Sequence, residues 1–205
     1  MNEARRERAD AVRNRRAILA ATERLLAEHR PADVSVDRIA AEAGVSKGTV
    51  FHRFGSRMGL MRELMIERAQ ALEHAVTSGP PPLGEGAPDR DRLLAFLDAI
   101  VEVVGRNKSL MAELAPAAAF SHGDEPRSTD DHPVYPVWHG HISGLIAAQR
   151  PDADAELIAH MLLGALQSEP ILGQLTSDGP DRLAAAMRSL MCALLDAPSR
   201  PATGR

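Results

Sequence analysis

Apolar residues recur three or four positions apart along most of the chain, and this spacing does most to limit the folds that the sequence can adopt. Residues with this spacing lie on one face of an α-helix. Clear examples are Ile18, Leu25 and Leu26, then Leu60, Leu64 and Leu72, then Leu93, Leu97 and Ile100. No run alternates between apolar and polar residues over the length of a β-strand. The sequence therefore predicts an all-α fold.

Composition narrows the class of protein further. The 205 residues are enough to bury a core, and with aromatic residues at only 3% that core must consist of Leu, Ala, Met and Val. The first residues are charged and no apolar stretch has the length of a bilayer span, so we expect neither a signal peptide nor a membrane segment. Cys192 is the only cysteine, which excludes an internal disulfide and favours a reducing, cytoplasmic location.

The charge is divided unevenly along the chain, although the net charge is only −4. Residues 1–60 contain twelve Lys and Arg against eight Asp and Glu, whereas the remainder contains twelve against twenty. An asymmetry of this kind indicates a nucleic-acid-binding module joined to a domain with another task.

Proline and glycine mark where the helical segments end. A linker is expected at about 78–88, where three consecutive prolines cannot continue a helix, and a loop at about 121–136, which is polar and rich in proline. Two strongly apolar helices are predicted at about 153–175 and 180–196. Pro170 should kink the first of them or end its regular hydrogen bonding.

The segment from Val34 to Leu60 contains the pattern most informative about function. Ser35 is a good N-cap for a short helix that ends at Gly44, and Ser46 can cap a second short helix. In that second helix Val50 and Phe54 share the inner face, and the outward positions are Lys47, Gly48, Thr49, Phe51 and His52. Two short helices joined by a glycine turn, the second with small, polar and basic residues exposed, are typical of a helix-turn-helix that enters the DNA major groove.

Residues 12–72 resemble the DNA-binding domain of the TetR family. The stretch RRAILAATERLLAE matches its first helix, and Gly44–Phe54 fits the pattern G-V-S-K-G-T, a hydrophobic residue, an aromatic residue, two variable residues and F. The resemblance implies a three-helix helix-turn-helix domain joined by a fourth helix to a helical ligand-binding and dimerisation domain. The parts it implies are a basic arm at 1–11, the DNA-binding domain at 12–56 with its motif at about 35–54, a connecting helix at 57–77, the C-terminal domain at 78–198 and a disordered tail at 199–205.

The resemblance also implies which residues contact double-stranded operator DNA. Lys47, Gly48 and Thr49 match positions that approach base edges and phosphates, and Gly48 suits a close approach because it has no side chain. Arg57 matches a phosphate-binding position at the start of a helix. Further contacts are expected from Ser35, Ser46, Phe51 and His52. Phe51 departs from the family, which usually has Tyr there, so a hydroxyl contact to phosphate is lost.

The arginines of the N-terminal segment have two interpretations. Arg5, Arg6, Arg8, Arg13, Arg15 and Arg16 could form a solvated charged tail. Alternatively, they could contact phosphates or an adjacent minor groove.

The resemblance further implies a homodimer formed by the last two helices. The interface residues that we expect are Leu162, Leu166, Met187, Leu190 and Leu194. The alternative is that these helices only close the core of one subunit. A small-molecule effector of unknown identity is also implied, and the residues expected to line its site are Phe96, Met111, Phe120, Trp138 and Met161. Each of these five could instead be an ordinary core residue.

Other classes of function receive little support from the sequence. His122, His132, His139 and His141 could indicate a metal, but no Cys or carboxylate motif accompanies them, so we expect no metal and no cofactor. The sequence contains no HExxH, no G-x-S-x-G and no phosphate-binding glycine loop, which argues against an enzyme. The sequence therefore favours a repressor released from DNA by an apolar or aromatic ligand, with a ligand-independent regulator or an activator of the same fold as the alternative.

Overall fold

The computed structural model describes residues 2–118, 134–177 and 179–198, which form nine α-helices and one short 3-10 helix without a strand. The all-α prediction is confirmed. In chain order the elements are α1 (Asn2–Glu28), η1 (Pro31–Asp33), α2 (Val36–Ala43), α3 (Lys47–Phe54), α4 (Arg57–Ser78), α5 (Asp89–Ala118), α6 (Tyr135–Gln149), α7 (Ala155–Ala165), α8 (Glu169–Ser177) and α9 (Pro180–Asp196). Among the described residues, no helix is long and apolar enough to cross a membrane.

Most expected boundaries agree with the structure, and two differ. The linker at 78–88 is confirmed, because α4 ends at Ser78 and α5 begins at Asp89. The apolar segment 153–175 forms two helices, α7 and α8, and Pro170 lies in the first turn of α8, where its missing N–H costs nothing. The segment expected as an arm is the beginning of α1. Much of the loop expected at 121–136 lies outside the described residues, as does the tail at 199–205.

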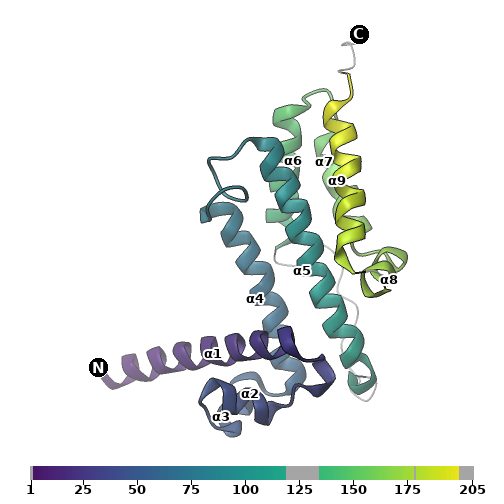
Figure 1. Cartoon of the computed structure of the whole chain (residues 1–205). Coiled ribbons are helices and arrows are strands. Elements are labelled where there is room, and N and C mark those ends of the chain that lie inside the picture. The colour runs from purple at the N-terminus through teal and green to yellow at the C-terminus, as the bar shows by residue number, and fades with distance from the viewer. Residues whose placement is uncertain (1, 119–133, 178, 199–205) are drawn as a thin grey trace. The chain divides into compact units, whose positions relative to one another are not determined.

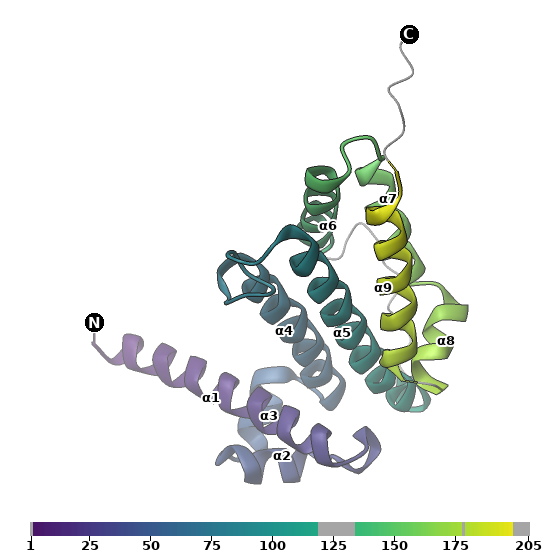
Figure 2. The same ribbon diagram turned by 45° about the horizontal axis from the view of Figure 1, so that its top comes forward.

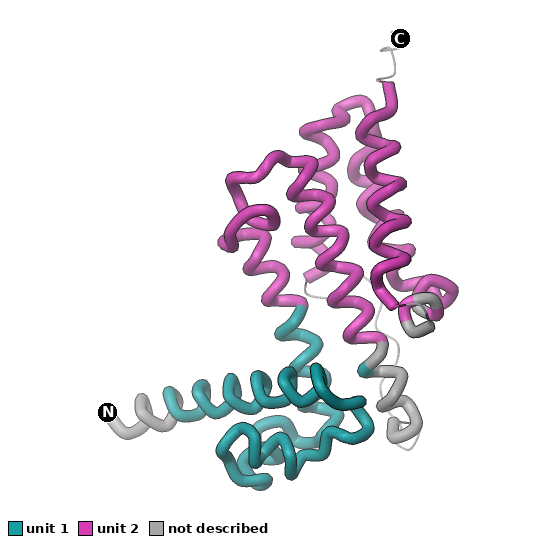
Figure 3. The backbone as a smooth tube through the Cα atoms, in the orientation of Figure 1, with its two compact units in different colours: residues 1–68, 110–122 teal, residues 69–109, 123–205 magenta. Residues whose placement is uncertain are grey.

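The chain divides into two compact units, which Figure 3 shows in different colours. Unit 1 comprises residues 1–68 and 110–122, and unit 2 comprises residues 69–109 and 123–205. Both α4 and α5 therefore contribute residues to each unit. The sequence predicted a DNA-binding domain that ends at 56, a connecting helix at 57–77 and a C-terminal domain from 78, whereas the contacts place the change of unit within α4 and α5.

Unit 1 is built around an apolar core to which every one of its helices contributes. Members of this core are Ile18 and Leu19 of α1, Ile39 of α2, Val50 of α3, Leu60 and Leu64 of α4, and Leu110 of α5. Each side chain of this size contributes about 1.5–3 kcal/mol when fully buried. The two shortest helices, α2 and α3, thus depend on the core of the whole unit, because helices of eight residues are not stable alone.

Ion pairs connect α1 to the helices that cross it. Arg15 Nη2 lies 2.6 Å from the carboxylate of Glu63 in α4, and Arg68 Nη2 of α4 lies 2.9 Å from Glu23. Arg24 pairs with Glu42 of α2 at 2.9 Å. Arg15 is therefore held by a carboxylate of α4 within unit 1 and is not part of a free charged tail.

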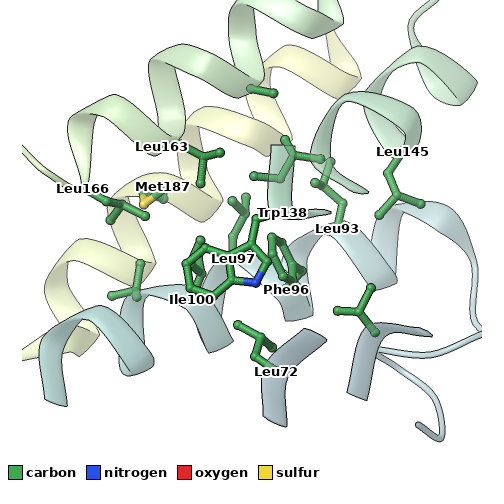
Figure 4. Packing of buried hydrophobic residues seen from close by; sticks show 14 of the residues in the cluster. Leu72, Leu93, Phe96, Leu97, Ile100, Trp138, Leu145, Leu163, Leu166 and Met187 are labelled. Carbon is green, nitrogen blue, oxygen red and sulfur yellow. The ribbon is translucent and has the colours of Figure 1, made fainter. Parts of the chain in front are cut away.

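Unit 2 is a bundle of α5, α6, α7, α8 and α9 with the C-terminal part of α4, and Figures 1 and 2 show α5 and α9 side by side. Its core includes Leu72, Phe96, Leu97, Ile100, Trp138, Leu163 and Met187 (Figure 4). At the surface the guanidinium of Arg90 binds the carboxylate of Asp196 with N–O distances of 2.5 and 3.0 Å. This hydrogen bonding lowers the pKa of Asp196 and ties the start of α5 to the end of α9.

Arg150 joins the end of α6 to the end of α9. Arg150 is only 8% exposed. Its Nη1 donates to the main-chain carbonyls of Leu194 and Ala197, and its Nε and Nη2 bind the carboxylate of Asp152 at 2.9 and 2.8 Å. The last carbonyls of a helix have no partner within it, so Arg150 satisfies groups that would otherwise be left unpaired.

We predict that Arg150→Gln lowers the melting temperature by several degrees, because the Asp152 carboxylate and two helix-end carbonyls lose their shared partner. Asp152→Asn should cost less, since the carbonyl contacts remain. Thermal unfolding followed by circular dichroism measures both. A melting temperature of Arg150→Gln equal to that of the unchanged protein would contradict this role.

Candidate functional site

The turn between α2 and α3 is fixed by caps on both sides. The Ser35 hydroxyl accepts a hydrogen bond from the main-chain N–H of Arg38 at 3.2 Å, as expected of an N-cap. Gly44 has φ 67° and ψ 31°, a left-handed conformation that residues with a side chain rarely adopt. The N–H of Val45 then bonds to the carbonyl of Ala40 at 3.0 Å. The chain therefore reverses sharply and α3 begins soon after α2 ends.

Hydroxyl groups at the start of α3 bind each other. Ser46 Oγ accepts from the main-chain N–H of Thr49 at 3.1 Å and lies 2.8 Å from Thr49 Oγ1. Both residues were predicted to contact DNA. Their hydroxyls stabilise the first turn of α3 in the free protein, so a contact with DNA must be made in addition to this cap or in exchange for it.

The two faces of α3 differ sharply in exposure. Val50 is 2% exposed and belongs to the core of unit 1, whereas Phe51 is 42% exposed. Lys47, Gly48 and His52 are also exposed. The structure thus confirms the outward positions that the sequence predicted, with Thr49 half-buried among them.

Gly48 has no internal reason to be glycine. A Cβ added there would meet only Ser46 Oγ, at an ordinary contact distance of 3.7 Å. Within a helix, glycine costs about 1 kcal/mol relative to alanine. Gly59 is the opposite case, because its added Cβ would lie 2.1 Å from the carbonyl oxygen of Phe54. Nothing in the described part of the chain therefore requires glycine at position 48.

Lys47 is held by a carboxylate of α2. Its Nζ lies 2.8 Å from Asp37 Oδ2, and both side chains are more than half exposed. Sequence reasoning missed this pair, since residues ten positions apart in different helices give no local signal. In an exposed ion pair the attraction is weak, so Lys47 can exchange Asp37 for another anion at little cost.

Arg57 uses part of its guanidinium within unit 1. Its Nε donates to the Val34 carbonyl at 3.2 Å, and its Nη2 donates to the Pro31 carbonyl. These bonds attach the N-terminus of α4 to the segment that leads into α2. Arginine has five N–H donors, so this structural role leaves donors for the phosphate contact that the resemblance implies.

The residues predicted to line an effector site do not all come together. Phe96 and Trp138 are buried in the core of unit 2 with ring centroids 6.4 Å apart. Met161 is 65% exposed on α7, so its assignment to this site is wrong. Phe120 lies outside the described residues, and so does the side chain of Met111.

His141 lies against Phe96 in the same region. The ring centroids are 4.9 Å apart and the planes meet at 72°, an edge-to-face arrangement. Burial, together with the positive charge of Arg92, lowers the pKa of His141 to about 4. The imidazole is therefore neutral at physiological pH.

His139 and His160 form hydrogen bonds and stack with their neighbours. His139 of α6 and His160 of α7 have ring centroids 4.0 Å apart, and Tyr135 Oη lies 2.7 Å from His160 Nδ1. Within the described ranges, no group of three or more His, Cys, Asp or Glu is placed to hold a metal ion. His122 and His132 lie outside those ranges.

A surface groove of roughly 770 Å³ lies over α5 and α9. Its lining includes Pro82, Ala99, Glu102 and Ala185, and an ion pair between Arg188 and Asp98 is part of its wall. The buried Phe96 and Trp138 do not line it, so this groove is distinct from the predicted effector site.

The predicted dimer residues fall into three groups. Leu166 and Met187 are 3% and 5% exposed and belong to the core of unit 2, so their assignment to a subunit interface is wrong. Leu162 and Leu194 are partly buried against the same core. Leu190 is 69% exposed on α9, and Leu157 and Met161, which are not among the five expected interface residues, are 54% and 65% exposed on α7.

Comparison with known proteins places the DNA-binding pattern in a family. The family model described as "Bacterial regulatory proteins, tetR family" matches residues 18–64. A curated relative, the uncharacterized HTH-type transcriptional regulator TtgW of Pseudomonas putida, is 33% identical over 98 residues. That alignment covers 47% of this chain and 70% of the relative.

Solved structures share the fold over nearly the full chain. A TetR transcriptional regulator from Streptomyces coelicolor aligns with a TM-score of 0.58 and 22% identity, covering 92% of this chain and 99% of that one. A TetR-family regulator from Pectobacterium atrosepticum gives 0.56 and 23%, covering 93% and 98%. The regulator FadR from Bacillus subtilis, solved in complex with stearoyl-CoA, gives 0.55 and 18%, covering 88% and 97%.

We predict an acid-dependent loss of stability that originates at His141. A histidine whose pKa is lower in the folded state than its ordinary value of 6.5 stabilises the fold above about pH 6.5, and this contribution is lost as the pH falls toward 4. The loss is up to about 3 kcal/mol. His141→Phe should flatten the fall in the free energy of unfolding over this range. Urea titrations of both proteins at a series of pH values test this, and parallel pH profiles would contradict it.

Proposed function

The chain belongs to the TetR family of bacterial regulatory proteins, and from this membership we propose that it is a homodimeric repressor whose operator is released when a small apolar molecule binds unit 2. It is a DNA-binding transcriptional regulator and not an enzyme. The observation that carries the proposal is the exposed face of α3, with Gly48 at its centre and Lys47, Phe51 and His52 around it.

The chemistry of this face fits the major groove. Gly48 lets the helix backbone approach base edges, and Lys47 supplies a cation that can move from Asp37 to a phosphate or a guanine. The exposed Phe51 ring offers apolar contact to a sugar or a thymine methyl group. The N-termini of α2 and α4 are natural anion sites, so Ser35 and Arg57 are well placed for phosphates on either side.

An exposed apolar face supports the dimer. Leu157 and Met161 are 54% and 65% exposed on α7, Leu190 is 69% exposed on α9, and both helices contribute residues to the core of unit 2. Apolar surface of this kind on two helices is typical of an interface. Leu162 and Leu194 can extend the interface where they emerge from the core. Two α3 helices related by a two-fold axis would then read two half-sites.

Two long helices can transmit ligand binding to DNA. Because α4 and α5 each contribute residues to both units, a change in how they pack in unit 2 alters the elements that support α2 and α3. A protein of this fold, FadR from Bacillus subtilis, has been solved with stearoyl-CoA. An effector here is proposed to lie near Phe96 and Trp138 and to favour an arrangement of α4 and α5 that does not fit DNA.

We predict opposite effects of Gly48→Ala on folding and on DNA binding. The substitution should stabilise the protein by about 0.5–1 kcal/mol, because alanine is the better helix former, while weakening operator binding at least tenfold by obstructing close approach. Gly140→Ala in α6 is the matched control, since an added Cβ there meets nothing within 4 Å and the residue is exposed, as Gly48 is. Thermal unfolding and fluorescence-anisotropy titration measure the two effects. Undiminished DNA affinity in Gly48→Ala would refute the proposed contact.

We predict that Leu190→Asp produces a folded monomer. The side chain is exposed in the single chain, so the charge costs nothing there, whereas it would be desolvated in the interface. Operator affinity should fall at least a hundredfold, because one subunit reaches only one half-site. Ala148→Asp, on the exposed side of α6, is the control. Sedimentation velocity decides the matter, and a Leu190→Asp protein that remains dimeric excludes this face as the interface.

A further inference from the structure

Arg92 and His141 of unit 2 each have a buried side-chain nitrogen without a partner in the described part of the chain. Arg92 Nε and His141 Nε2 are shielded from solvent and have no hydrogen-bond partner among the residues that the structure describes. An unpaired buried donor or acceptor costs about 1–3 kcal/mol, so such groups are few in folded proteins and each one calls for an explanation. Arg92 is also a cation, and its ion pair with Asp89 in the same turn is a long one, with 3.7 Å between Nη1 and the carboxylate.

The two nitrogens border an aromatic surface that is shared by α5 and α6. Arg92 and Phe96 lie one turn apart on the same face of α5, and Trp138 and His141 lie one turn apart on α6. The ring centroid of Phe96 lies 4.9 Å from that of His141 and 6.4 Å from that of Trp138, and both ring pairs are edge-to-face. Figure 4 shows Phe96 beside Trp138, with Leu72 and Leu93 nearby. Polar donors and apolar rings thus meet at one place in the fold.

We propose that Arg92 and His141 bind the carboxylate of a monoanionic effector whose apolar body packs against Phe96 and Trp138. This assignment rests on the proposed function, since it names the chemistry recognised at the effector site of unit 2. The guanidinium donates to the carboxylate through Nε and a terminal nitrogen, the two-bond geometry that arginine forms with carboxylates. His141 donates from Nε2 as a neutral imidazole.

The charges around Arg92 and His141 favour a ligand with a single negative charge. Arg92 contributes one positive charge, His141 is neutral at physiological pH, and Asp89 beside Arg92 offsets part of the field. A dianionic phosphate would need more positive charge than this to compensate its desolvation. An ammonium group would be repelled by Arg92, and a neutral hydroxyl gains no charge-assisted bond.

The test compares acids with alcohols of the same shape. The probes are decanoate and 1-decanol, and 4-phenylbutanoate and 4-phenylbutanol, each titrated into the full chain at neutral pH. Trp138 is the only tryptophan and lies in the proposed site, so its fluorescence reports occupancy directly. We expect at least one acid to bind about tenfold or more tightly than its alcohol, as a charge-assisted bond at a buried site would give.

Variants locate the source of this preference. Arg92→Gln should bring the acid-to-alcohol ratio of affinities close to one, and His141→Phe should lower the same ratio. Arg106→Gln is the matched control, because Arg106 is an exposed arginine on the same helix. Circular dichroism spectra confirm that each variant is folded.

The outcomes separate this inference from the proposed function. Equal binding of acids and alcohols, no binding of either acid, or an acid preference that survives Arg92→Gln would each overturn the carboxylate site. Operator release is measured separately by fluorescence anisotropy with the same probes. An acid preference that depends on Arg92, without release of DNA, would support the site and contradict the ligand-released repressor.

Discussion

The exposed face of α3 depends on the packing of Val50 in the core of unit 1. Helix α3 has only eight residues and cannot persist alone, so its outward face exists because its inward face is anchored among Ile39, Leu60 and their neighbours. The caps at Ser35 and Ser46 and the left-handed Gly44 then set the angle at which α3 leaves α2. Local capping and long-range packing therefore determine the same surface, and neither suffices without the other.

Unit 2 presents a different physical problem, because it keeps polar groups within an apolar core. Arg150 binds the carbonyls that end α9 and the Asp152 carboxylate, and so serves the fold. Arg92 and His141 are partly buried, and each has one shielded nitrogen without a partner in the described chain, so they fit a ligand better than a structural role. Arg150 thus has protein partners and stabilises the fold, whereas Arg92 has a shielded nitrogen left for a ligand.

Sequence reasoning predicted what local chemistry determines. The N-caps, the glycine turn, the outward residues of α3 and the linker before α5 each follow from neighbouring residues, and the structure agrees. The dimer face could not be chosen in the same way, because α9 has apolar residues on several sides, and periodicity does not say whether Met187 or Leu190 faces its own core. The pairs Lys47–Asp37 and Phe96–His141 join different helices, so only the packed fold brings them together.

The central claim is that two copies of α3, held by one dimer, read one operator. Footprinting on the DNA upstream of the protein's own gene tests this most directly, with the unchanged protein and Lys47→Ala compared side by side. The account predicts two protected half-sites, arranged as an inverted repeat about one helical turn or a multiple apart, and both should weaken together in the variant. Protection of a single unpaired site, or a pattern that Lys47→Ala leaves unchanged, would contradict it.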